Sequence, residues 1–244
     1  MAWKRNGDPG HGSFIYENCL KRTRILLADD HKIVLEGLKS LLEPEFDLVG
    51  TVEDGRALVS QAEQLRPDLI IVDISMPLLN GIEAVCQIKK IDPSVKVVFL
   101  TMHPDVTYAI RAFEAGAVGY VLKHSASTEL LTAIREALQG RTFVTPIIAG
   151  ELLQSYQVGN HRQPDKTKQL TNRQRELLQL FAEGHSVKEI AQILSISTRT
   201  VEFHKYNLLS TLNLKNFSAL IQYAIKHGII EAEPTEKNLH PESE

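Results

Sequence analysis

Five polar side chains suited to phosphoryl chemistry stand directly after short apolar runs in the sequence. Asp29 and Asp30 follow residues 24–28, Asp73 follows 69–72, Thr101 follows 95–100 and Lys123 follows 118–122. Unbroken apolar runs of this length are typical of strands buried on both faces of a parallel sheet. Because ligands bind at the edge where the carboxyl ends of such strands meet, we expect these side chains to share one pocket.

The charges of that pocket indicate its chemistry. Three crowded carboxylates repel one another and become partly protonated unless a cation joins them. Mg2+ suits a site of a few carboxylates that keeps several waters, and an Asp carboxylate can accept a phosphoryl group as an acyl phosphate. Lys123 and Thr101 would hold the phosphoryl oxygens. A single Asp after a strand is more often a helix cap or turn residue, but capping does not explain the recurrence at separate strand ends.

The elements between these residues alternate as a parallel sheet requires. Apolar residues at helical spacing follow each run, for example Leu35, Leu38 and Leu42 after the first. The expected strands span residues 24–28, 46–52, 69–72, 95–100 and 118–122. Five strand–helix units predict an α/β fold with a doubly wound, five-stranded parallel sheet and helices on both faces. Periodicity leaves the strand order open.

Composition limits the class of protein. The 244 residues are 43% hydrophobic and 23% charged, as in an ordinary soluble globular protein. No apolar run approaches the roughly 18 residues of a membrane span, and residues 1–22 lack the apolar core of a secretory signal. Cys19 and Cys86 are too few for a disulfide framework or a zinc site. We therefore expect a cytoplasmic protein in which Cys86 packs within a helix.

The charges divide unevenly along the chain. Residues 23–139 hold 11 Lys plus Arg against 17 Asp plus Glu, and residues 165–230 hold 9 against 5. The last stretch, 231–244, has five Glu against one Lys. The acidic N-terminal segment and the basic C-terminal segment suggest two domains with different partners. Nucleic acid is the partner expected for the basic segment. Chance variation between two surfaces is the alternative that charge alone leaves open.

These patterns predict five segments. Residues 1–22 form a disordered leader, 23–140 the α/β domain, 141–169 a linker with a helix over 146–156, 170–230 an all-α module and 231–244 an acidic disordered tail. The all-α module shows four helical patterns, over 173–182, 187–194, 198–212 and 217–227. Thr171 and Thr198 are the expected N-caps of the first and third of these helices.

Residues 24–139 resemble a response-regulator receiver domain. The resemblance rests on Asp29-Asp30, on Asp73-Ile-Ser-Met-Pro77, on Asn80-Gly81, on Thr101 and on Gly119-Tyr-Val-Leu-Lys123. It implies a flavodoxin-like strand order of 2-1-3-4-5. It also implies that Asp73 accepts a phosphoryl group from a sensor histidine kinase, that Thr101 and Lys123 bind the phosphoryl oxygens, and that Tyr120 turns inward as a switch. The implied Mg2+ ligands are Asp29, Asp30, Asp73 and the main-chain carbonyl of Ser75.

Four side chains near this pocket have no assigned role. In receiver domains the positions of Ser75 and His103 affect how fast the acyl phosphate hydrolyses, but a solvated His103 is the expectation here. Met102 is bulkier than the small residue common after the Thr, so it restricts Thr101 or simply packs. His31 is expected to start a helix rather than bind a metal.

Residues 170–230 resemble the LuxR-type helix-turn-helix of the NarL/FixJ class of response regulators. The matching residues include Leu170 to Glu176, Glu183-Gly184, Lys188-Glu-Ile-Ala191, Thr200-Val201 and His204. In the third helix, Val201, Leu208 and Leu212 should pack inward, and the opposite face should enter the major groove. The predicted DNA contacts are Lys188, Arg199, Glu202, Phe203, Lys205, Tyr206 and Lys215; Ser210 shares the exposed face.

Individual contacts can be assigned by side-chain chemistry. The lysines would pair with phosphates, Glu202 would accept from a cytosine amino group and Phe203 would meet a thymine methyl. Thr211, Asn213 and Phe217 stand where the family often has Lys, Gly and Arg, so affinity for phosphates should be modest. Dimerisation should then matter more, because two half-sites add their contacts.

Together the two resemblances predict a phosphorylation-dependent transcriptional regulator that is not itself an enzyme beyond its own phosphotransfer and autodephosphorylation. Its expected cofactor is Mg2+, and its expected partners are a sensor histidine kinase, promoter DNA, a second copy when phosphorylated and RNA polymerase. Two alternatives stay open. A phosphohydrolase could use Asp73 as nucleophile, although haloacid-dehalogenase-like phosphatases have an Asp where this chain has Ser75. A signalling adaptor would bind protein alone.

Overall fold

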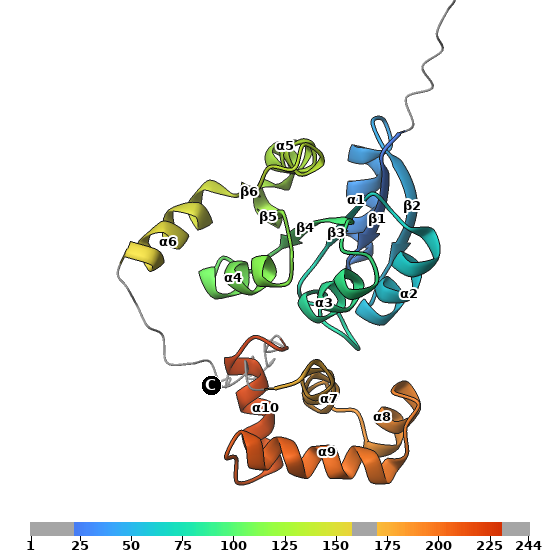
Figure 1. Cartoon of the computed structure of the whole chain (residues 1–244), viewed down its shortest axis with the longest axis vertical. Coiled ribbons are helices and arrows are strands. Elements are labelled where there is room, and N and C mark those ends of the chain that lie inside the picture. Colours follow the sequence, from blue (N-terminus) through green and yellow to red (C-terminus); the bar gives the residue numbers. More distant parts are fainter. Residues whose placement is uncertain (1–21, 158–169, 231–244) are drawn as a thin grey trace, which may run out of the picture.

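The computed structural model describes residues 22–157 and 170–230. Residues 1–21 of the predicted leader, residues 158–169 of the predicted linker and the acidic tail lie outside the described residues. Figure 1 shows an α/β domain with a sheet at its centre, and a smaller helical module built from α7 to α10. Within the described ranges, no helix is long and apolar enough to cross a membrane.

One parallel sheet in the order β2-β1-β3-β4-β5-β6 organises the first domain. Its strands are β1 (Arg24–Ala28), β2 (Asp47–Val52), β3 (Leu69–Val72), β4 (Lys96–Thr101), β5 (Gly119–Leu122) and β6 (Phe143–Val144). All five predicted strands are present. The sixth was not predicted, because two residues between Gly140 and Pro146 are too few to show a period, and it pairs with β5 through Gly119↔Phe143 and Tyr120↔Val144.

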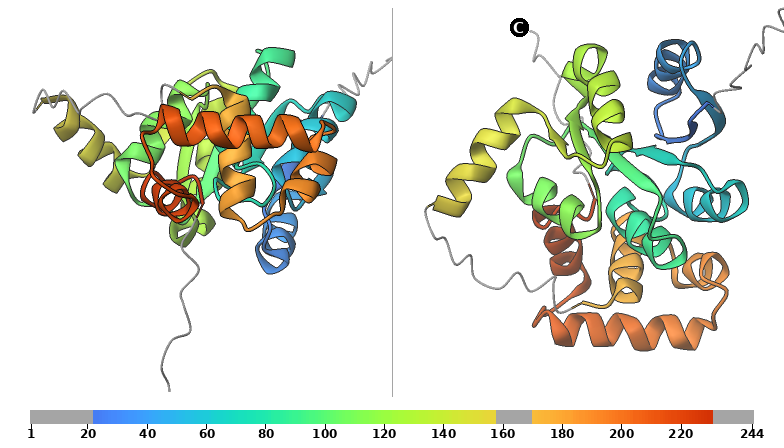
Figure 2. Two further views of the ribbon diagram at one scale, coloured as in Figure 1. Left: turned by 90° about the horizontal axis from the view of Figure 1, so that it is seen from below. Right: turned by 45° about the horizontal axis from the view of Figure 1, so that its top comes forward.

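Helices cover both faces of the sheet, as predicted (Figure 2). They are α1 (Lys32–Leu42), α2 (Gly55–Leu65), α3 (Gly81–Ile91), α4 (Val106–Glu114) and α5 (Ala126–Leu138), with the short η1 (Lys123–Ser125) before α5 and α6 (Pro146–Gln157) after β6. Successive strand residues point to opposite faces. Leu26 therefore packs in the core beneath α2, α3 and α4, and Leu27 in the core beneath α1 and α5.

The helical module consists of α7 (Asn172–Ala182), α8 (Val187–Ile193), α9 (Thr198–Thr211) and α10 (Phe217–Lys226), close to the four predicted helices. Thr171 caps α7 as expected, in a reciprocal bond pattern with Gln174. The predicted cap of α9 was wrong by one residue. Ser197 has the extended backbone of an N-cap and accepts a hydrogen bond from the amide of Thr200, whereas Thr198 is already the first helical residue.

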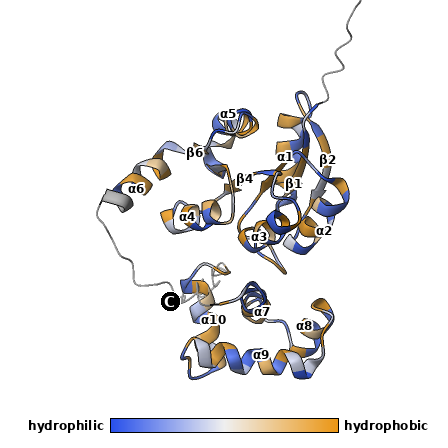
Figure 3. Cartoon of the chain, viewed as in Figure 1, coloured by the Kyte–Doolittle hydropathy of each residue, from blue (hydrophilic) through white to orange (hydrophobic). Residues whose placement is uncertain are grey.

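The third helix of the module separates its apolar residues from its polar ones. Val201 and Leu208 are fully buried and Leu212 is nearly so, which confirms the predicted inward face. They join the module core with Leu177, Phe181 and other residues of α7, α8 and α10. Figure 3 shows α9 with hydrophilic residues along much of its length. Figures 1 and 2 place α9 on the side of the module away from the sheet domain.

Candidate phosphoacceptor site and nucleic-acid interface

Asp73 lies directly after β3, at the edge of the sheet where the carboxyl ends of the strands meet, and is buried. Its side chain is 4% exposed, and Oδ1 accepts a 2.6 Å hydrogen bond from the amide of Ile74. Lys123 places Nζ 2.6 Å from Asp73 Oδ2 and 2.8 Å from Asp29 Oδ2. Strand ends therefore bring together three of the residues that the sequence predicted in one pocket.

The electrostatics of this pocket are those of crowded, buried charges. Burial raises the pKa of Asp73 to about 6, while the charge and hydrogen bond of Lys123 oppose that rise and the charge of Asp29 adds to it. Burial lowers the pKa of Lys123, but the adjacent carboxylates of Asp73 and Asp29 more than offset this and raise it. A second cation at this edge would favour the ionised carboxylates further.

Asp29, Asp30, His31 and Asp73 form an acidic cluster whose potential ligand atoms lie within 4.8 Å of one another. Receiver domains generally bind Mg2+, and an oxygen-rich donor set beside a buried carboxylate is the chemistry that this ion prefers. His31 precedes α1 as predicted, and its Nδ1 lies 2.8 Å from Asp30 Oδ1. The donor set fits Mg2+ through its carboxylates.

Thr101 and Tyr120 are both fully buried in this structure. The Thr101 hydroxyl oxygen accepts a 3.3 Å hydrogen bond from the amide of His103, and the Tyr120 hydroxyl donates to the His103 carbonyl over 2.9 Å. Tyr120 thus already points inward here. Met102 is 61% exposed. The structure therefore supports neither of its two expected roles, which were to restrict Thr101 or simply to pack.

His103 differs from the expectation of a solvated side chain. It is half-buried, its Nε2 lies 2.8 Å from Ser75 Oγ, and its ring stacks on Tyr108 with the centroids 4.1 Å apart. The prediction was wrong because Tyr108, in the first turn of α4, brings an aromatic face next to the loop after β4. His103 therefore links the loop that follows Asp73 to α4.

The loop after Asp73 depends on a close backbone approach at Gly81. A Cβ at Gly81 would stand 1.9 Å from the carbonyl oxygen of Asp73, so only glycine fits. Gly81 also donates its amide to the Ile74 carbonyl at 2.8 Å. Asn80 caps α3 by accepting from the amide of Glu83 over 3.0 Å. The Asn80-Gly81 pair noted in the sequence therefore closes the loop after Asp73 and starts α3.

Contacts between the α/β domain and the module were missed by sequence analysis. Gln179 of α7 is 1% exposed; its Oε1 accepts from the Asn80 amide at 2.7 Å, and its Nε2 donates to the Met76 carbonyl at 2.9 Å. Arg56 of α2 pairs with Glu176 of α7. The available signal was weak: Gln179 is a polar residue between the apolar pairs Leu177-Leu178 and Leu180-Phe181.

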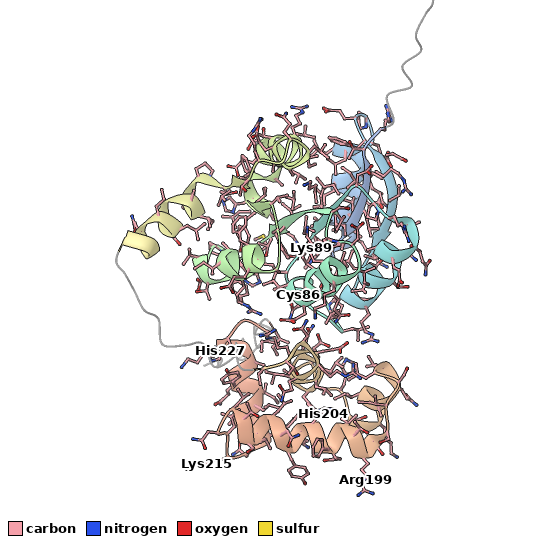
Figure 4. The ribbon with its side chains drawn as sticks, viewed as in Figure 1. Cys86, Lys89, Arg199, His204, Lys215 and His227 are labelled. Atoms are coloured by element: carbon pink, nitrogen blue, oxygen red, sulfur yellow. The ribbon has the colours of Figure 1, made fainter. Side chains whose placement is uncertain are left out.

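Glu83 is a buried carboxylate at the same interface. It is 2% exposed and lies 3.5 Å from Arg175 of α7 and 3.8 Å from Arg111 of α4. Burial raises its pKa above the usual range of a glutamate, with the two arginines opposing the rise. Cys86 and Lys89, labelled on α3 in Figure 4, follow on the same helix. Cys86 packs against the core as predicted.

A second contact joins α4 to the end of α10. Arg111 donates to the His227 carbonyl at 3.3 Å. Gly228 has a left-handed backbone (φ 60°), and a Cβ there would stand 1.8 Å from the Tyr108 hydroxyl oxygen. Tyr108 therefore contacts both His103 and the helical module. Figure 4 shows His227 on the side of α10 that is nearest the α/β domain.

The predicted nucleic-acid face is largely open to solvent. Phe203 is 61% exposed and Tyr206 68% exposed. Arg199, Ser210, Lys188 and Lys215 are also exposed, and Glu202 is half-buried. Arg199 and Lys215 lie at opposite ends of the module's outer edge in Figure 4. The α/β domain therefore leaves this face uncovered.

Lys205 is placed differently from its exposed neighbours. Its Nζ lies 4.8 Å from the centroid of Phe217 and 5.8 Å from that of Phe181, and the residue is half-buried. A lysine ammonium over aromatic faces gains a cation–π attraction. Lys205 therefore packs against α10 and α7, whereas Phe203 is exposed on the predicted nucleic-acid face.

Residues 25–135 match the response regulator receiver domain family, and residues 168–224 match the family of bacterial regulatory proteins called luxR. The oxygen regulatory protein NreC of Staphylococcus epidermidis is 34% identical over 218 residues, covering 85% of this chain and 99% of NreC. This chain belongs to the response regulators of the NarL/FixJ class.

Other similar proteins agree with that assignment. The transcriptional regulatory protein DegU of Brevibacillus brevis is 33% identical, covering 86% of this chain and 96% of DegU. A structure of RcsB from Salmonella enterica serovar Typhimurium, bound to promoter P1flhDC in the presence of the phosphomimetic BeF3−, matches with a TM-score of 0.53 and 32% identity. The match covers 83% of this response regulator and 97% of the RcsB chain.

Substitution of Lys205 tests the predicted nucleic-acid face of this response regulator. Because Lys205 also packs against Phe217 and Phe181, the replacement should retain part of its side chain. Lys205→Gln removes one cation and keeps only the first part of the aliphatic side chain, so binding should weaken by a similar factor at all DNA sequences. The slope of log affinity against log salt should fall by about one. Fluorescence anisotropy over a salt series measures both, with Lys226→Gln on α10 as the matched control. A changed sequence preference at an unchanged slope would contradict a phosphate contact.

Proposed function

We propose that this response regulator controls transcription through phosphorylation of Asp73, which is supplied by a sensor histidine kinase. The observation that carries the proposal is the position of Lys123, whose ammonium lies between Asp73 and Asp29 at 2.6 and 2.8 Å. An acyl phosphate on Asp73 would place its oxygens next to this cation and near the Thr101 hydroxyl. The proposed domain bounds are 23–140 for the receiver and 170–230 for the DNA-binding domain.

Mg2+ is the proposed cofactor. Asp29, Asp30, Asp73 and the main-chain carbonyl of Ser75 would hold it. When bound, Mg2+ supplies charge neutralisation for the phosphoryl group and for the crowded carboxylates. Asp73 supplies the nucleophilic oxygen, which must be ionised to attack. Lys123 favours that ionised form and would hold the phosphoryl oxygens in place, and the buried Thr101 hydroxyl would donate a hydrogen bond to one of them.

The output is proposed to be promoter binding by a pair of phosphorylated chains in the cytoplasm, with RNA polymerase as a further partner. The RcsB structure with promoter DNA and a phosphomimetic supports this output by analogy. Phe203 and Tyr206 are exposed while the DNA-binding domain contacts the receiver. Phosphorylation therefore need not uncover α9. Pairing of two receivers, which adds the contacts of two half-sites, is the route that this geometry favours.

The function can be tested by phosphorylating the full chain with acetyl phosphate and Mg2+. The phosphorylated protein should form dimers in light scattering and should enrich a limited set of genomic fragments more strongly than the unphosphorylated protein. The reason is that two linked half-site contacts raise affinity for paired sites above that of one module. Lack of any DNA enrichment in either state would point to a protein-binding adaptor. Steady hydrolysis of a phosphomonoester would indicate a phosphatase.

A further inference from the structure

The DNA-binding domain is in direct contact with the loop that follows the phosphoacceptor. Gln179 bonds to both ends of this loop: its Nε2 donates to the Met76 carbonyl at 2.9 Å, and its Oε1 accepts from the Asn80 amide at 2.7 Å and from Asn80 Nδ2 at 3.2 Å. Glu183 fixes the orientation of Gln179 by accepting from its Nε2 over 2.7 Å. All of these groups are largely removed from water.

The middle of the loop is held by the same domain. Leu78 has a left-handed backbone with φ of 65°, a conformation that is unfavourable for a branched residue. Its amide lies 3.3 Å from Glu183 Oε2, and its side chain packs against the core of the DNA-binding domain. Strained backbone persists when surrounding contacts determine it. The DNA-binding domain supplies these contacts through Glu183 and its apolar core, in addition to the receiver's own Gly55 amide, which donates to the Pro77 carbonyl at 3.4 Å.

The held residues are adjacent to the proposed metal site. Met76 follows Ser75, whose carbonyl is a proposed Mg2+ ligand, and Gly81 bonds back to the Ile74 carbonyl at 2.8 Å. Residues that orient a metal ligand without touching the metal raise the affinity of the site for the metal. They do so because the ligand then loses less conformational freedom when the metal binds. Docking of α7 therefore restricts the segment that carries one ligand and lies beside the nucleophile.

We propose that Gln179, in the DNA-binding domain, is a positioning residue of the phosphoacceptor site. It holds the Met76–Asn80 loop so that the receiver binds its divalent cation more tightly when the two domains are docked. Docking of the two domains then favours phosphorylation instead of inhibiting it. The inference rests on the proposed function of Asp73, and it predicts reciprocity: a cation in the pocket should stabilise the docked arrangement.

Gln179→Ala in the full chain tests this proposal with Mn2+ as a probe of the cation site. Free Mn2+ measured by electron paramagnetic resonance gives the dissociation constant, which should rise about tenfold, the lower end of effects from residues supporting a ligand. Gln192→Ala, an exposed glutamine on α8 of the same domain, is the matched control and should leave it unchanged. An unchanged or tighter Mn2+ affinity for Gln179→Ala would overturn the proposal.

Two further measurements separate positioning from simple loss of structure. The Mg2+ concentration that gives half of the maximal phosphorylation rate should rise with Gln179→Ala, while the rate at saturating Mg2+ stays within about twofold; partial unfolding would instead lower the amount of phosphorylated protein. Gly228→Ala leaves α7 intact but places a Cβ against Tyr108, and it should also weaken Mn2+ binding by separating the domains. Normal Mn2+ affinity in that variant would count against docking as the cause. None of these measurements uses DNA, so their failure is distinct from failure of DNA control by Asp73.

Discussion

Asp73→Asn is expected to abolish phosphorylation of the chain by acetyl phosphate and Mg2+, and with it any change of DNA affinity on adding the phosphodonor. The amide keeps the shape of the carboxylate and can still accept the hydrogen bond from Ile74, so the fold should survive. It lacks the anionic oxygen that attacks phosphorus and attracts Lys123. Phosphate-affinity electrophoresis measures the modification, and anisotropy titrations of a selected promoter fragment measure DNA affinity.

The matched control is Asp47→Asn, which changes an exposed aspartate at the amino end of β2, far along its strand from the pocket edge. That variant should be phosphorylated normally and should respond as the wild type does. Equal DNA affinities of phosphodonor-treated wild type and Asp73→Asn would refute control of DNA binding by this residue. Continued phosphorylation of Asp73→Asn would show that the phosphoryl group is carried elsewhere.

Gly81→Ala should destabilise the receiver by about 3 kcal/mol, the upper range for overpacking a close contact. The added methyl would stand 1.9 Å from the Asp73 carbonyl oxygen, and backbone atoms on both sides cannot move apart without breaking the start of α3. Urea unfolding followed by circular dichroism measures the loss. Because the same backbone positions Asp73, the surviving folded protein should also be phosphorylated more slowly.

A glycine with free space around it gives the opposite expectation. Gly37 lies on the exposed side of α1, and nothing stands within 4 Å of where its Cβ would be. Gly37→Ala should therefore stabilise the protein by roughly 0.5–1 kcal/mol, through better helix propensity. Similar losses of stability for both variants would mean that the close approach at Gly81 is not what requires glycine.

Much of the receiver could be predicted because its features are local in sequence. Apolar runs fix the strands, and a residue directly after a parallel strand must stand at one edge of the sheet, so Asp29, Asp73 and Lys123 could be grouped without coordinates. The inward face of α9 followed from helical spacing in the same way. Ser197 was missed as a cap because Ser197 and Thr198 have equivalent capping chemistry, and only the backbone conformation distinguishes them.

The contacts between domains could not be predicted from sequence. Gln179 and Tyr108 carry no signal of their partners, because Met76 and Gly228 are far from them along the chain and lie on the other domain. His103 was expected in solvent for a related reason: its stacking partner becomes a neighbour only after β4 and α4 take their places. Such contacts form between surfaces of elements that have already folded, so the local periodicity of the sequence does not predict them.

The uncovered face of α9 has a consequence for where this regulator resides in a cell. A basic helical domain whose reading helix is accessible before phosphorylation can rest weakly on any stretch of the chromosome, because backbone phosphates attract it without regard to sequence. Copies bound in this way would slide and hop along the genome while waiting for a signal. Phosphorylation would act on molecules already scanning DNA, so the response time at a promoter would be set by the meeting of two scanning copies rather than by a search from free solution.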